Sequence, residues 1–138
     1  MQAKPTLRLP AGEAAYQQER AARQAAGDSS CPLCRAPDIR AYRFWRLIPN
    51  HFPYDKIART HHMLVPKRCV PEEEIAAQEW EELTHIKREL APAYHFYMET
   101  TIRQRSVRQH YHLHCVELGG PCSLPTHDPF VCDSNEEG

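Results

Sequence analysis

Three histidines at alternate positions place the strongest constraint on how this chain can fold. The stretch "QHYHLHCVEL", residues 109–118, contains His110, His112 and His114. Side chains alternate between the two faces of a β-strand, so we expect the three imidazoles to share one face. The other face would then carry Tyr111, Leu113 and Cys115. Adjacent imidazoles repel one another when protonated and compete for partners when neutral, so this pattern indicates a functional site more than a surface.

Two kinds of chemistry can use such a row of imidazoles. Several rings could hold one metal ion, or one ring could act as a nucleophile or acid–base catalyst beside groups that orient it. Alternate residues of a strand lie roughly 6.5 to 7 Å apart, which makes it difficult for three of them to reach a single ion. A catalytic metal on the three-histidine strand therefore stands as the alternative to catalysis by an imidazole.

A pair of cysteines is the second feature that indicates a functional site. "CPLC" joins Cys31 and Cys34 in a C-x-x-C spacing, which is typical of zinc knuckles and also of redox pairs. A redox pair would follow a strand and open a helix, whereas this pair follows "AAGDSS" and leads into the proline-containing "RAPD". This context favours a metal site.

The overall composition narrows the class of protein. The 138 residues suffice for one domain with its own core. Lys and Arg number 17 against 18 Asp and Glu, so the net charge of -1 gives no reason to expect nucleic acid or a membrane surface as the main partner. No apolar run approaches the roughly 20 residues of a membrane span, and the first residues lack a secretory signal. We therefore expect a cytoplasmic protein, with thiols or metal ligands rather than disulfides.

Hydrophobic spacing predicts an α+β arrangement. Residues 13–26 favour a helix, and 39–48 indicate a strand with an exposed basic face. Residues 71–90 predict an amphipathic helix that carries Trp80 in the core. Two antiparallel strands are expected at 93–100 and 107–118.

The order of the motifs resembles the histidine triad superfamily. "HYHLHCV" fits the family pattern His-x-His-x-His-x-x, and "CPLC", "NHFPY" and "HHMLVPKR" precede it in the family's order. The resemblance covers about residues 31–118, with 1–30 as an N-terminal helical extension and 119–138 as a tail. It implies an antiparallel sheet of about five strands with an amphipathic helix packed across it, and pairing into homodimers.

The resemblance implies that the middle histidine, His112, attacks the α-phosphate of a nucleotide. The substrate would be a nucleoside phosphoramidate or a (di)nucleoside polyphosphate, and water or another acceptor would resolve the nucleotidyl-histidine intermediate. His114 would contact the phosphate or the leaving group, although in a shifted register it would itself be the nucleophile. The resemblance implies phosphate and ribose contacts from Ser106, Asn50 and His61. Arg105 has no family counterpart and is a candidate phosphate contact because the charge of the transition state needs fixed donors. Asn50 also fits a turn residue, and Arg105 also fits a solvated hairpin.

The resemblance also implies one structural zinc ion per chain. Its ligands would be Cys31, Cys34 and His110, with Cys69 at the position where the family has a histidine. Thiolate and imidazole both suit a tetrahedral zinc site, so the substitution keeps a ligand. His112 would remain free of metal. A zinc-stabilised nucleotide-binding or interaction module without turnover is the further alternative.

Overall fold

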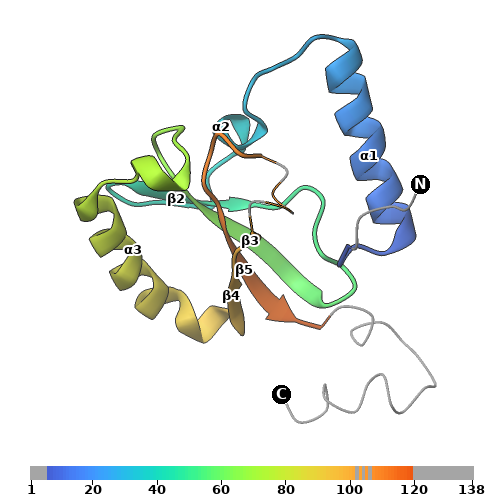
Figure 1. The fold of residues 1–138 in the computed structure, drawn as a ribbon. Coiled ribbons are helices and arrows are strands. Elements are labelled where there is room, and N and C mark those ends of the chain that lie inside the picture. The colour runs from blue at the N-terminus through green and yellow to red at the C-terminus, as the bar shows by residue number, and fades with distance from the viewer. Residues whose placement is uncertain (1–5, 102, 104, 106, 120–138) are drawn as a thin grey trace, which may run out of the picture. The chain divides into compact units, whose positions relative to one another are not determined.

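The computed structural model describes residues 6–101, 103, 105 and 107–119, and contains helices and one β-sheet (Figure 1). The helices are α1 (Pro10–Ala25), α2 (Pro32–Arg35) and α3 (Ala77–Leu90), with short 3₁₀ turns at Glu72–Glu74 and Ala91–Ala93. The strands are β1 (Arg40–Ala41), β2 (Trp45–Pro49), β3 (Ala58–Pro66), β4 (Phe96–Met98) and β5 (Leu113–Leu118). Among these described helices, none has the length and apolar character that a membrane span needs.

The five strands form one sheet in the order β1-β2-β3-β5-β4. The pairs β1/β2, β2/β3 and β4/β5 run antiparallel. In the last pair Met98 lies opposite His114 and Phe96 lies opposite Val116, so the predicted pairing of these two segments is confirmed. The α+β class with a five-stranded antiparallel sheet is also confirmed.

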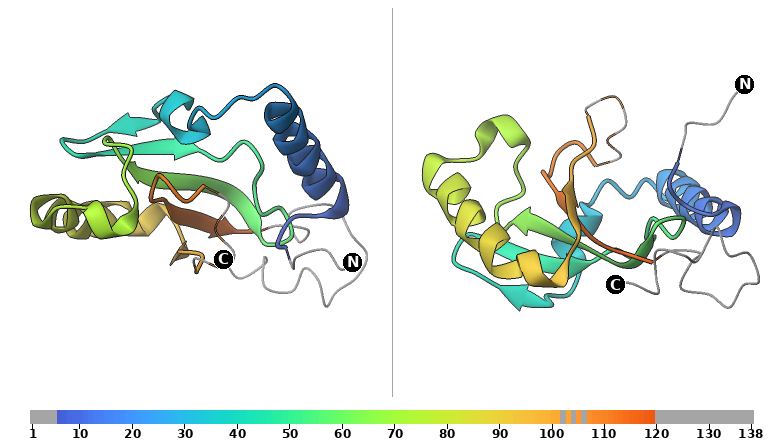
Figure 2. Two further views of the ribbon diagram at one scale, coloured as in Figure 1. Left: turned by 45° about the horizontal axis from the view of Figure 1, so that its top comes forward. Right: turned by 90° about the horizontal axis from the view of Figure 1, so that it is seen from below.

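Helix α3 covers one face of this sheet, as the two views in Figure 2 show. Leu83, Ile86 and Leu90 recur at helical spacing and bury their side chains on this face. Trp45 of β2 is fully buried beneath the helix and donates its indole N–H to the carbonyl of Glu79 at 2.7 Å. Trp80 packs against the same cluster, which confirms its expected place in the core.

The opposite face of the sheet packs against the turn that carries the first two cysteines. Side chains alternate along β2, so Trp45 and Leu47 face α3 while Ile48 faces the other way. Ile48 forms a second cluster with Leu33 of α2 and with Met63 and Val65 of β3. This cluster fixes α2 on the sheet.

The chain divides into two compact units, and α1 belongs to the unit that also contains segment His51–His61. The carboxylate of Asp55 accepts the Leu9 N–H at 2.6 Å and so caps the start of α1. Arg8 lies 4.0 Å from the ring centroid of Tyr16 and donates to the Phe52 carbonyl at 2.8 Å. Gly27 ends the helix with φ 68°, a left-handed conformation that favours glycine.

Segment 39–48 forms a hairpin, so the prediction of one strand was wrong. Strands β1 and β2 are joined by a turn in which Glu82 of α3 accepts the N–H groups of Arg43 at 3.1 Å and Phe44 at 2.7 Å. A carboxylate from a distant helix thus stabilises a turn that has none of the usual turn residues. The face that was expected to be exposed and basic is also partly buried, because the Arg46 side chain is only 15% exposed.

The helix predicted over 71–90 begins at Ala77 instead. The three glutamates before it form a separate 3₁₀ turn, and Ile75 is extended and buried. The Glu79 carboxylate accepts the Ala76 N–H at 2.8 Å and thereby defines the helix start. Because Ile75 is extended and buried in the core, the residues before Ala77 cannot continue the predicted helix.

Candidate functional site

The segment with the three histidines is only partly a strand. Gln109 and His110 form a bend, and β5 begins at Leu113, so the expected strand start at 107 was wrong. Before β5 the segment hydrogen-bonds to the turn after β3, since the Tyr111 N–H donates to the Val70 carbonyl at 2.9 Å. The alternation of faces still holds from residue 111 onward. Tyr111, Leu113 and Cys115 all lie in the core under α3.

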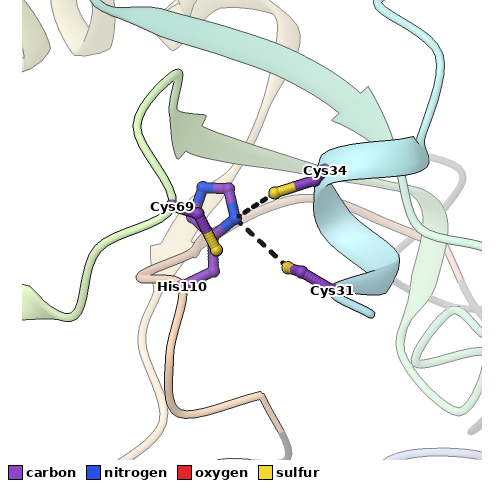
Figure 3. A group of neighbouring side chains, drawn as sticks. All are labelled: Cys31, Cys34, Cys69 and His110. Carbon is purple, nitrogen blue, oxygen red and sulfur yellow. Dashed lines mark hydrogen bonds between the residues drawn. The ribbon is translucent and has the colours of Figure 1, made fainter. Parts of the chain in front are cut away.

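Four potential metal ligands converge from three separate segments (Figure 3). Cys31 precedes α2 and Cys34 lies within it, Cys69 follows β3, and His110 lies in the bend before β5. Their ligand atoms all lie within 4.8 Å of one another. The predicted ligand set is therefore brought together in space.

The spacing of His110 from two of the cysteines matches that around a tetrahedral zinc ion. His110 Nδ1 lies 3.4 Å from Cys31 Sγ and 3.5 Å from Cys34 Sγ. Around a tetrahedral ion with Zn–S of about 2.3 Å and Zn–N of about 2.0 to 2.1 Å, sulfur and nitrogen are about 3.5 to 3.6 Å apart. The residues present thus fit the ion.

The tautomer of His110 also suits a metal ligand. Its Nε2 lies 2.7 Å from the Pro66 carbonyl oxygen. Because a carbonyl only accepts, Nε2 carries the hydrogen and Nδ1 keeps its lone pair. Burial lowers the pKa of His110, which favours the neutral ring that a metal requires.

Cys69 and Cys34 lie in an environment that opposes negative charge. Burial, followed by hydrogen bonding and charge from Cys34 and Cys31, raises the pKa of Cys69 to about 12. Burial also raises the pKa of Cys34. Neighbouring thiolates repel one another, and a divalent cation removes this repulsion. The donor set therefore suits a cation that prefers sulfur and nitrogen.

His112 is buried next to this cluster and has a defined tautomer. Its Nδ1 lies 3.0 Å from the carbonyl oxygen of His110, so Nδ1 carries the hydrogen and Nε2 keeps a lone pair. The residue is 9% exposed. Burial lowers the pKa of His112, and the positive charge of Arg105 acts in the same direction. Both effects favour the neutral imidazole, which is the nucleophilic form.

His114 lies in β5, beside His112, which precedes the strand. The two ring centroids are 5.2 Å apart with planes at 86°, and His114 is 3% exposed. A second buried imidazole therefore lies within reach of groups that His112 would contact.

Three further residues, Ser106, Arg105 and Asn50, were predicted to contact the nucleotide. Ser106 lies outside the described residues. Arg105 donates to the Thr100 carbonyl at 2.9 Å and pairs with Glu72 at 3.4 Å, so it is already anchored in its loop. The Asn50 amide nitrogen lies 3.8 Å from the sulfur of Met63.

His61 belongs to the same unit as the segment before it. It is 5% exposed, and its Nδ1 accepts the Tyr54 N–H at 2.9 Å. Its ring centroid lies 4.5 Å from that of Tyr54. Its expected role near the phosphate stays a prediction.

Arg46 of β2 belongs to the surroundings of the four ligands, and sequence reasoning missed it. Its guanidinium donates to the carbonyls of Leu33, at 3.2 Å, and Ala36, and pairs with Asp38. The only signal in the sequence is that Arg46 shares a strand face with the apolar Ile48.

Comparison with known proteins gave a likeness in structure but none in sequence. No protein-family model matches the chain, and no curated protein matches it in sequence. A histidine triad protein from Clostridium difficile is similar in structure, with 16% sequence identity and a TM-score of 0.44. The similarity covers 79% of this chain and 95% of that protein. The proposals below therefore rest on the residues of this chain.

Proposed function

We propose that this chain is a nucleotide hydrolase or nucleotidyl transferase of the histidine triad type, with His112 as its nucleophile. The observation that carries the proposal is the hydrogen bond from His112 Nδ1 to the His110 carbonyl, 3.0 Å long. It directs the lone pair to Nε2 and holds the ring in one orientation. An oriented, neutral imidazole is what nucleophilic attack on phosphorus requires.

The reaction would proceed in two displacements at the α-phosphate. In the first, Nε2 of His112 forms a bond to phosphorus while the bond to the leaving group breaks. His114, in its protonated form, would supply the proton that the leaving amine or phosphate takes up. In the second, water or another acceptor attacks phosphorus and gives its proton back to His114, the phosphorus–Nε2 bond breaks, and the neutral imidazole of His112 is restored.

Phosphate recognition would involve a cation and a hydroxyl near the nucleophile. Arg105 is close enough for its charge to lower the pKa of His112, and a fixed positive charge stabilises the charge that develops on the phosphoryl oxygens. Ser106, Asn50 and His61 complete the proposed nucleotide contacts. A nucleotide ligand and pairing into a homodimer are expectations from the family resemblance.

We further propose that Cys31, Cys34, Cys69 and His110 bind one structural zinc ion. Three thiolates and one imidazole fill all four tetrahedral positions, which is typical of structural rather than catalytic zinc sites. The ion would cross-link the α2 turn, the turn after β3 and the bend before β5. His112 would act without contacting it.

Hydrolysis of adenosine phosphoramidate by purified protein tests the proposed activity. The wild type should turn over this substrate, and His112→Ala should lose about a thousandfold or more of kcat. His85→Ala is the matched control, because His85 is an exposed histidine on α3 and its loss should leave kcat unchanged. Full turnover by His112→Ala would overturn the proposal. Nucleotide binding without turnover by the wild type would instead favour a binding module.

A further inference from the structure

The guanidinium of Arg46 fastens the cysteine turn to the sheet. It donates to the carbonyl oxygens of Leu33, at 3.2 Å, and Ala36. These carbonyls lie on either side of Cys34 in the chain, at the end of the four-residue helix α2. A planar guanidinium can bind two such oxygens at once, whereas a lysine ammonium is a single point charge.

The position of Arg46 also brings a positive charge to the metal cluster. Its side chain is 15% exposed, so solvent screens it less than a surface arginine. Its guanidinium donates to the carbonyls of Leu33 and Ala36, which flank Cys34 in the chain. The Arg46 charge therefore lies close to the segment that supplies two of the ligands.

A zinc ion held by three thiolates and one neutral imidazole carries a net charge of -1. Cys34 and Cys69 are exposed, so solvent stabilises part of this charge, and a nearby guanidinium that is largely shielded from solvent attracts it further. Asp38, the carboxylate that pairs with Arg46, is 45% exposed and so faces solvent more than the arginine does.

We propose that Arg46 is a positioning residue of the metal site, which fastens α2 so that Cys31 and Cys34 face His110 and offsets the negative charge of the metal-bound thiolates. This inference rests on the proposed zinc site and goes beyond it, because Arg46 acts through the carbonyls of Leu33 and Ala36. Groups that orient metal ligands from outside typically change metal affinity by about 10- to 100-fold when they are removed.

Zinc affinity, measured by competition with a chromophoric chelator, tests the first half of the proposal. Arg46→Met should bind zinc about 10- to 100-fold more weakly than the wild type. Arg46→Lys should fall between the two, because it keeps the charge but loses the two-pronged contact. Arg40→Met is the matched control, since Arg40 on the same hairpin is 53% exposed and pairs with Glu89, and its affinity should equal that of the wild type.

Cobalt(II) spectra of the same variants test the second half. A nearby positive charge stabilises the electrons of the thiolates, so its loss should shift the thiolate-to-cobalt charge-transfer bands to longer wavelength. We expect this shift in Arg46→Met and not in Arg46→Lys. A purely structural role for Arg46 would leave the bands of the metal-loaded protein in place.

The outcomes separate this inference from the proposed site itself. Wild-type zinc affinity and wild-type bands in Arg46→Met would overturn the role of Arg46. Failure of the wild type to bind zinc would overturn the metal site, and the role of Arg46 with it. Should Arg46→Met fail to fold, Arg46→Lys decides, because wild-type affinity in that variant would show that the two-pronged contact does not matter.

Discussion

The main-chain carbonyl oxygen of His110 lies 3.0 Å from Nδ1 of His112. The same His110 directs its side chain at the cysteines, with Nδ1 3.4 Å from Cys31 Sγ. The ring of His110 thus lies among the four candidate metal ligands, and its carbonyl contacts the proposed nucleophile. Metal binding should therefore influence catalysis through the position of the His110 backbone.

Removal of the Cys69 thiol should cost both zinc and turnover. Cys69→Ala deletes one of four ligands, so we expect well under one zinc per chain and a fall in kcat that exceeds any change in KM. Cys69→His is the matched variant, because imidazole is an equally suitable zinc ligand, and it should keep most of the zinc. Metal analysis with steady-state kinetics on both variants checks this. Equal zinc loss from both would contradict the assignment of Cys69.

Arg105 should contribute to phosphate binding as well as to its loop. Arg105→Met should lower kcat/KM about 10- to 100-fold, since a hydrogen bond to a charged group contributes about 1.5 to 3 kcal/mol. Glu72→Gln removes the partner carboxylate of Arg105 but keeps the guanidinium, so it should cost much less. Kinetics on adenosine phosphoramidate compare the two. An equal loss in both variants would mean that Arg105 only anchors the loop.

Glu79 should make folding stability depend on acid pH. Hydrogen bonds from Arg68 and the Ala76 N–H lower the pKa of Glu79 from its ordinary value of 4.5. A lowered pKa means that the unfolded chain binds the proton more readily, so this stabilisation is complete above about pH 4.5 and is lost as pH falls through the folded-state value. The stability advantage of the wild type over Glu79→Gln, measured by urea unfolding, should shrink below about pH 4.5. An advantage that stays constant or grows there would contradict this account.

Ile86 should carry much of the packing between α3 and the sheet. It is 2% exposed in the main core cluster, so Ile86→Ala should destabilise the fold by about 2 to 5 kcal/mol. Arg88→Ala, an exposed position on the same helix, should change stability by no more than about 0.5 kcal/mol. Urea unfolding followed by tryptophan fluorescence measures both. Similar values for the two variants would show that α3 does not pack as described.

The sequence predicts the buried side of α3 and of the histidine segment because each follows from local periodicity. Leu83, Ile86 and Leu90 recur at helical spacing, and Tyr111 and Leu113 alternate with the histidines. The buried side of each segment can therefore be predicted from that segment alone.

The metal cluster could be predicted only in part. Cys31 and Cys34 carry their own spacing signal, but Cys69 is 35 positions further along and joins them only through the fold. Its assignment therefore needed the family resemblance. Arg46 escaped prediction because a charged residue in a strand usually indicates a solvated face, and nothing local reveals the carbonyls of Leu33 and Ala36 beside it.

The errors in the predicted secondary structure arose where hydrogen bonds to groups distant in the sequence determine the local conformation. The turn between β1 and β2 depends on Glu82, which is 38 residues from Phe44. The late start of β5 depends on the hydrogen bonds from Tyr111 to Val70 and from His110 to Pro66. Such partners come from tertiary structure and leave no pattern in a short window of sequence.

Zinc content and turnover, measured together on wild type, Cys69→Ala and His112→Ala, test the division of labour between His110 and His112 most directly. We predict one zinc per wild-type chain, loss of zinc in Cys69→Ala, and retention of zinc with loss of adenosine phosphoramidate hydrolysis in His112→Ala. Loss of zinc from His112→Ala would contradict the account, because it would make the three-histidine segment a metal site and His112 a ligand.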